Sequence, residues 1–198
     1  MNDEKESPDQ QNADFDILYK ARPALDLMDK FTQAYTPGCE LAVDEAMTGF
    51  KGRFFLKHYL LGKPTKWGIK AWGLADSSNG YILKCDIYKG KKNRQQDLLL
   101  GEQVVLQLTE NFWGKWHIYL DKFFSSTNLM KMLLEQETYS CGTTRANRKH
   151  WPTEFRKPTV LKLKKGESRK MQHEDVTGGS VARQTCCSPP FYKFRSPD

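Results

Sequence analysis

The sequence predicts an α/β domain with a partly antiparallel sheet. Three observations support this fold class. Apolar periodicity runs in the order helix, three strands, helix, strand, helix, strand. A hydrophobic content of 38% and an aromatic content of 12% suit a packed core with polar ends. A length of 198 residues is enough for one sizeable domain, whereas two full domains would need more.

The N-terminal part predicts a polar head followed by a helix. Residues 1–13 are polar and acidic, and we expect them to be disordered. Residues 14–36 should be helical, since Pro23 suits a first turn and YTPG at 35–38 ends the pattern. The apolar positions at helical spacing are Leu18, Ala21, Leu25, Met28 and Phe31.

Three strands should follow. CELAVDEA (39–46) has Leu41 and Val43 on one face, and WGIKAWGLAD (67–76) resembles a second strand. YILKCDIYKG (81–90) alternates, so that Tyr81, Leu83, Cys85 and Ile87 face one way. The turn cluster DSSNG joins the last two, which should therefore form a hairpin. We assign Asp76, at that turn, and Asp86, within the third strand, structural roles.

The rest of the predicted domain alternates helices and strands. Residues 98–112 carry apolar side chains at intervals of four, which indicates a helix. Residues 116–121 should form a strand, and Ser125, Ser126 or Thr127 should cap another helix. Residues 137–145 predict a last strand. The domain would span residues 37–165, and residues 166–198 should form an irregular basic tail.

The charge distribution favours a polyanionic partner. The net charge is +7, and residues 145–198 carry thirteen Lys or Arg against five acids, whereas residues 1–16 carry six acids and one lysine. Nucleic acid would fit this basic second half, although solvated surface charge explains it too. No run approaches the roughly 18 apolar residues of a membrane helix, and no apolar secretory leader is present. We therefore expect an intracellular protein without a membrane partner.

Two of the predicted strands end on an aspartate, at Asp44 and at Asp121. Strand ends are rigid and neighbouring ends converge, so these carboxylates could bind Mg²⁺ in a fixed geometry. Each could equally satisfy a turn. Basic residues beside an acidic metal site would suit a phosphate backbone. The candidate DNA-binding residues are Lys51, Arg53, Lys63, Lys66, Lys70, Arg145, Arg148 and Lys149.

Several longer motifs carry a family resemblance. YTPGCELAVDEAMTGFKGR, KHYLLGKPTKWGIKAWGLADSSNGYILKCDIYKG, LLGEQVVLQL and YLDKFFSSTNLMKMLLEQETYSCGTTRANRKHWP occur in this order. From Asp16 to Pro152 the chain resembles the transposase domain of piggyBac-type elements and their domesticated derivatives, with a weaker echo in LKKGES (163–168).

The resemblance implies a ribonuclease-H-like mixed sheet flanked by helices, and a triad of aspartates that binds two Mg²⁺ ions. Asp44 in VDE would match the first aspartate and Asp121 in LDKFFSS the second. The family cuts transposon ends and joins them to TTAA targets in the nucleus, so DNA and a nuclear location are implied. Residues 14–36 would be a remnant of its N-terminal dimerisation and DNA-binding region.

The chain departs from the family pattern where the third aspartate is expected. The pair Gly178–Gly179 is followed by Ser and Val rather than aspartate, and Lys122 stands where the family usually has Asn. We therefore expect a domain that is incomplete on its C-terminal side, DNA-binding and catalytically defective. Three alternatives stay open. The enzyme could be active with a third carboxylate from Glu174, Asp175 or another chain. The chain could be a non-catalytic partner in a homodimer, or in a heterodimer with a full-length transposase. It could also be a poorly folded product.

Overall fold

The computed structural model describes residues 16–90, 98–156, 163–164, 166–181 and 191–193. The chain divides into two compact units, Met1–Thr36 and Pro37–Asp198. The predicted acidic head, residues 1–13, lies outside the described residues.

The first unit contains α1 (Arg22–Ala34), which confirms the predicted helix from Arg22 onward. Pro23 lies in its first turn, where a missing backbone N–H costs no hydrogen bond. The helix is amphipathic but contains no buried residue, and the side chains of Leu27 and Phe31 are 48% and 57% exposed. An apolar surface of this kind is available for contact with another molecule.

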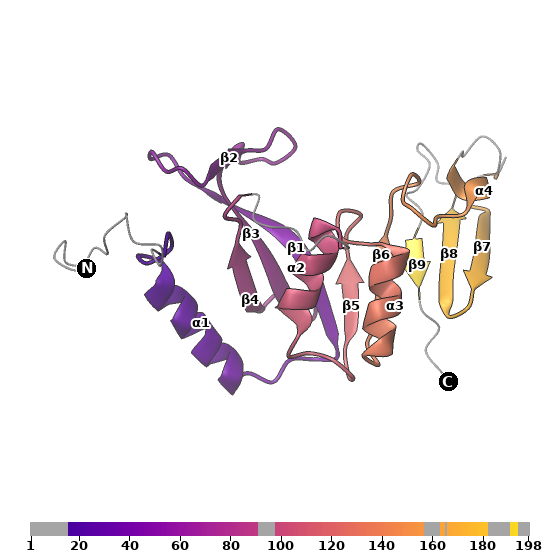
Figure 1. Cartoon of the computed structure of the whole chain (residues 1–198), viewed down its shortest axis with the longest axis horizontal. Coiled ribbons are helices and arrows are strands. Elements are labelled where there is room, and N and C mark those ends of the chain that lie inside the picture. The colour runs from indigo at the N-terminus through magenta and orange to yellow at the C-terminus, as the bar shows by residue number, and fades with distance from the viewer. Residues whose placement is uncertain (1–15, 91–97, 157–162, 165, 182–190, 194–198) are drawn as a thin grey trace. The chain divides into compact units, whose positions relative to one another are not determined.

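The second unit is built on a mixed sheet (Figure 1). Its central strand, β1 (Glu40–Gly49), pairs antiparallel with β3 (Trp67–Asp76) and parallel with β5 (His117–Leu120). On its other side β3 pairs antiparallel with β2 (Lys57–Tyr59) and with β4 (Ile82–Ile87). The predicted hairpin of the second and third strands is therefore confirmed as β3 and β4, whereas β2 was not predicted.

The sheet continues beyond β5 with β6 (Tyr139–Thr143), which is parallel to β5, and then with β9 (Phe191–Lys193), β8 (Val176–Val181) and β7 (Ser168–His173). The last three strands are antiparallel to their neighbours. The prediction that residues 166–198 form an irregular tail is therefore wrong over 168–181 and 191–193. All six residues of β7 are exposed, so no apolar alternation marked the strand.

Two helices lie against one face of this sheet, α2 (Leu100–Thr109) and α3 (Thr127–Glu135) (Figure 1). Both were predicted. Ser126 caps α3 by accepting a hydrogen bond from the backbone N–H of Leu129 at 3.0 Å. A short helix, α4 (Thr153–Arg156), was not predicted. The core between the helices and the sheet consists of fully buried side chains that include Leu41, Leu74, Val105, Leu108, Ile118, Leu129 and Leu133.

The observed length of β1 corrects one detail of the prediction. The strand does not end at Asp44 but continues to Gly49, because β3 pairs with it over the whole register from Leu41↔Asp76 to Gly49↔Gly68. Its pairing with the shorter β5 ends at Val43. Asp44 is thus the first residue of β1 beyond the paired segment of β5.

Candidate metal centre

Asp44 and Asp121 lie next to each other at the point where the parallel pairing of β1 and β5 ends. Val43 pairs with Leu120 in the last register position, and each aspartate is the next residue of its chain segment. Together with Thr143 of β6 they line one open depression of about 460 Å³. The sheet therefore brings together the two carboxylates that the sequence singled out.

The alternation of side chains along the strands explains why these carboxylates are accessible. Val43 and Leu120 are 2% and 5% exposed and contribute to the core. Because successive strand residues point to opposite faces, Asp44 and Asp121 point away from that core. Both are exposed. A hydrated cation and a phosphate can reach such carboxylates without disturbing the packing.

Within the described part of the chain, few polar groups bond to these two carboxylates. The hydroxyl of Thr143 donates a hydrogen bond to Oδ1 of Asp121 at 3.2 Å. Oδ1 of Asp44 accepts the backbone N–H of Glu45 at 2.7 Å. The sequence reasoning did not identify Thr143, although its place in a predicted strand next to the 116–121 strand could have indicated it.

The loop that carries Asp121 is held by its own backbone and by Arg148. The N–H groups of Phe124 and Ser125 donate to the carbonyl oxygen of Asp121 at 3.0 and 3.1 Å. The guanidinium of Arg148 donates to the carbonyl oxygens of Lys122 and Phe123 at 3.1 and 2.5 Å. These contacts fix the direction in which Asp121 leaves β5.

A tyrosine also lines the depression. Burial raises the pKa of Tyr119, and the hydrogen bond from its hydroxyl to Oε1 of Glu40 at 3.2 Å raises it further. A phenol with a raised pKa stays protonated near neutral pH. The single hydroxyl proton of Tyr119 is donated to Glu40.

The donor set fits a hard divalent cation. Carboxylate oxygens are the ligands that Mg²⁺ prefers, and this ion is commonly held by one or two carboxylates together with water and substrate phosphate. In the described part of the chain, no three acid, histidine or cysteine side chains come close enough together to hold a metal ion. The observed residues thus match a site with two protein carboxylates.

The acidic residues considered as a third ligand lie elsewhere. Glu174 is in the turn between β7 and β8, where its carboxylate accepts a hydrogen bond from Nζ of Lys131 at 2.5 Å. This hydrogen bond lowers the pKa of Glu174. Asp175 is exposed in the same turn. Neither residue joins Asp44 and Asp121 in a ligand group.

The candidate DNA-binding residues fall into two groups in the structure. Three have partners within the protein: Lys63 and Lys70 bond to Glu45, and Arg148 bonds to the loop after Asp121. The exposed ones are Lys51, Arg53, Lys66, Arg145 and Lys149. Lys51, Arg53 and Lys66 lie in the segment between β1 and β3, whereas Arg145 and Lys149 follow β6.

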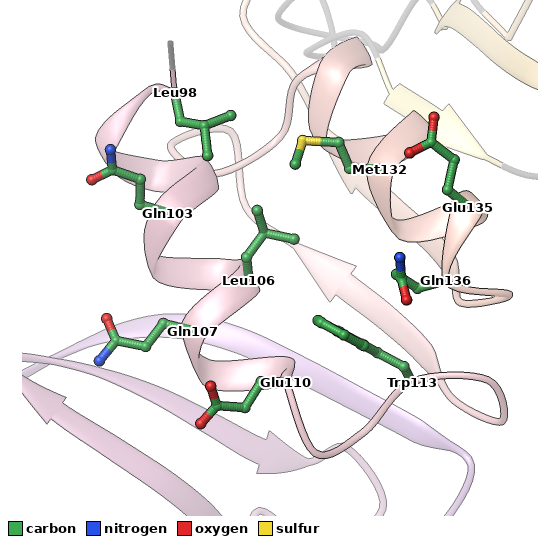
Figure 2. A pocket seen from close by; sticks show the side chains of 9 residues that line it. All are labelled: Leu98, Gln103, Leu106, Gln107, Glu110, Trp113, Met132, Glu135 and Gln136. Carbon is green, nitrogen blue, oxygen red and sulfur yellow. The ribbon is translucent and has the colours of Figure 1, made fainter. Parts of the chain in front are cut away.

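A second hollow lies between α2 and α3, away from the aspartates (Figure 2). It has a volume of about 540 Å³. Figure 2 shows Leu106, Trp113 and Met132 on its walls, and the polar lining consists of glutamines with Glu110 and Glu135. None of the described residues that line this groove is cationic, and its Glu110 already pairs with Lys84 at 2.5 Å, so the groove is a poor candidate for a site that binds a metal ion and a phosphate.

Comparison with known proteins identifies the family of the chain. A family model described as Transposase IS4 matches residues 2–192. Human PiggyBac transposable element-derived protein 3 is 30% identical over 137 residues, which cover 66% of this chain and 23% of that protein. Human PiggyBac transposable element-derived protein 2 is 30% identical over 142 residues, which cover 67% and 24%.

A solved structure agrees with these matches. A chain in the cryo-EM structure of a piggyBac transposase synaptic complex with hairpin DNA has a TM-score of 0.82 and 28% identity. The alignment covers 92% of this chain and 39% of that one. The fold is therefore the ribonuclease-H-like fold of transposases.

The chain belongs to the Transposase IS4 family and is of the piggyBac-derived type. It spans about a quarter of the length of the curated relatives that it matches. Among the helices that the structure describes, none has the length and apolar character needed to cross a membrane.

Proposed function

We propose that this chain is a DNA-binding transposase-derived domain in which Asp44 and Asp121 hold a Mg²⁺ ion. The observation that carries the proposal is the register of β1 and β5, which places two exposed carboxylates side by side in one depression. When bound, such an ion can neutralise charge on a phosphate oxygen during strand cleavage. The protein contributes the two carboxylates, and Thr143 orients one of them.

DNA is the proposed polyanion because the structural relative is a transposase in complex with hairpin DNA. The basic residues that the proposal uses are the exposed ones, Lys51, Arg53, Lys66, Arg145 and Lys149. Each phosphate contact releases counterions, so the affinity for duplex DNA should fall steeply as salt is raised. By family resemblance, the DNA would be transposon ends and TTAA targets in the nucleus.

We propose further that the isolated chain binds DNA and metal but does not cleave DNA. The described residues supply two carboxylates at this site, whereas two closely spaced Mg²⁺ ions need more negative charge. Incubation of intact transposon-end DNA with the chain and Mg²⁺ or Mn²⁺, with nicking as the readout, tests this point. Cleavage that is lost in Asp44→Ala would overturn the claim of defective catalysis and would establish an active metal-dependent nuclease.

The alternative, an active site completed by another chain, is favoured by the exposed apolar side of α1. Leu27 and Phe31 could support a homodimer or a heterodimer with a full-length transposase. Light scattering would reveal a dimer that dissociates in Phe31→Ser. Cleavage that appears only when an intact relative is added would show that the partner supplies the missing carboxylate.

A further inference from the structure

We propose that Lys70 is a positioning residue that fixes Asp44 and Asp121 relative to each other from the opposite face of the sheet. The inference rests on the proposed metal site of these two aspartates. It assigns to Lys70 a role inside the protein, in place of a contact with a DNA phosphate. Three sets of contacts support it.

The first contact joins Lys70 to the strand that carries Asp44. Nζ of Lys70 lies 2.5 Å from Oε2 of Glu45, and the two side chains are 14% and 19% exposed. Glu45 directly follows Asp44 in β1, so its side chain points to the opposite face. An ion pair with little exposure to water is held more firmly than a surface pair, because solvent competes less for either charge.

The second set of contacts surrounds the ammonium group with aromatic rings. Nζ of Lys70 lies 5.4 Å from the ring centroid of Trp72 and 5.5 Å from that of Tyr88. Both distances allow a cation–π attraction. Trp72 belongs to β3 and Tyr88 follows β4, and the two rings pack edge to face at 5.1 Å. The ammonium group is thereby restricted to one position beneath β1.

The third contact reaches the loop that carries Asp121. Nζ of Lys70 lies 5.4 Å from the ring centroid of Phe123, two residues after Asp121. One cation therefore contacts Glu45, which directly follows Asp44, and Phe123, which lies two residues after Asp121. Because strands β1 and β5 are no longer paired beyond Val43 and Leu120, Lys70 supplies a link where the sheet hydrogen bonds have ended.

Another lysine of the same unit provides a matched control. Nζ of Lys57 lies 5.4 Å from the ring centroid of Trp67 and donates to the carbonyl oxygen of Gly52 at 3.0 Å. Lys57 thus makes the same kind of contact as Lys70, on β2 rather than beneath the aspartates. Substituting either lysine by methionine keeps an unbranched side chain and removes the charge.

The test compares Lys70→Met with Lys57→Met in the full chain. Mn²⁺ binding is measured by calorimetry, and hydrogen exchange is followed at the amides of Phe124 and Ser125, which bond to the carbonyl oxygen of Asp121. Lys70→Met should weaken Mn²⁺ binding by about tenfold, the lower end of the loss caused by removing a group that orients metal ligands. It should also accelerate exchange at both amides. Lys57→Met should change neither quantity by more than about twofold.

Equal Mn²⁺ affinity and equal exchange in the two variants would overturn the proposal, whether or not the wild-type chain cleaves DNA. If the wild-type chain binds no Mn²⁺, the proposed metal site fails, and the exchange data alone then decide whether Lys70 holds the loop. Lys70→Arg should restore most of the affinity, since it keeps the charge. If Lys70→Met does not fold, Phe123→Leu removes the ring contact at similar volume, and unchanged Mn²⁺ affinity and exchange in that variant would contradict the proposal.

Discussion

Glu102 is a buried carboxylate that connects the starts of both covering helices, and its removal should destabilise the second unit strongly. The side chain is 3% exposed. Oε2 accepts the backbone N–H of Leu99 at 2.8 Å, which satisfies a donor at the start of α2. Oε1 accepts the hydroxyl of Ser126 at 2.5 Å, and Ser126 in turn caps α3. One side chain therefore supports two helix caps.

The cost of Glu102→Ala can be estimated from these contacts. Loss of the interaction at the start of α2 costs about 1 kcal/mol, as for other capping side chains. The buried hydroxyl of Ser126 would lose its acceptor, which costs about 1–3 kcal/mol. We therefore expect Glu102→Ala to lower the free energy of unfolding by about 3 kcal/mol. Glu102→Gln should cost about 1 kcal/mol, because an amide can accept from Leu99 and donate to Ser126.

Urea denaturation at neutral pH, monitored by tryptophan fluorescence, measures these changes in the free energy of unfolding. Glu110→Ala, at the C-cap of the same helix, is the control, since Glu110 pairs with Lys84 at a side-chain exposure of 51% and should contribute less than about 1 kcal/mol. In a double-mutant cycle, Glu102→Ala and Ser126→Ala should couple by at least about 1 kcal/mol. Additive effects, or a cost of Glu102→Ala no larger than that of Glu110→Ala, would refute the reasoning.

Three further predictions concern the sheet and the site. Gly142→Ala should lower the thermal midpoint clearly, because an added Cβ would lie 2.4 Å from the carbonyl oxygen of Leu120; Gly73→Ala, whose Cβ would approach its nearest neighbour at 3.9 Å, should have a much smaller effect. Burial raises the pKa of Asp86, so the folded state holds a proton more tightly than the unfolded state, and stability falls as pH rises through that pKa. Asp86→Asn should thus be more stable than the wild-type chain at neutral pH, and a gain that persists well below the ordinary pKa of aspartate would contradict this cause. Thr143→Val should weaken Mn²⁺ binding several-fold with little change in unfolding free energy, since it removes the hydrogen bond to Asp121; unchanged binding would exclude an orienting role.

Apart from α1, which contains no buried residue, the elements that sequence patterns predicted have a buried face. The predicted strand 67–76 matches β3 at both ends, and its side chains Trp72 and Leu74 are buried. The start of α3 was narrowed to three residues because Ser and Thr are strong capping residues, and Ser126 is the one that accepts the bond. For the strand 67–76 and for the start of α3, a pattern within a few consecutive residues was sufficient for the prediction.

Three of the strands that were not predicted, β2, β7 and β8, show no alternation of apolar and polar residues. β2 has three residues, too few for an alternation to appear. β7 is exposed throughout, and β8 contains Gly178 and Gly179, which have no side chain to show a period. At Gly178 an added Cβ would lie 2.9 Å from the ring of Trp151. The glycine is thus explained by a contact between distant segments, which no local pattern can reveal.

A buried aspartate, Asp76, and an exposed one, Asp44, show which part of the site could be predicted from the sequence. Asp44 and Asp76 both follow apolar strand residues, yet Asp76 is 1% exposed and accepts hydrogen bonds from Gly38 and from the backbone and hydroxyl of Ser78. The structural role assigned to Asp76 is therefore confirmed. Its hydrogen-bonding capacity is used by the fold, because a buried carboxylate must be satisfied.

The fold makes much less use of the hydrogen-bonding capacity of Asp44. Its carboxylate is exposed, its Oδ1 accepts a hydrogen bond from the backbone N–H of its own neighbour Glu45, and Asp121 lies beside it. Two like charges that share a depression repel each other, and a divalent cation between them would remove that repulsion. Such a placement adds little to folding and favours a ligand. Sequence alone suggested the residue type, but the parallel register of β1 and β5 is what distinguishes a candidate metal ligand from an aspartate that serves a turn.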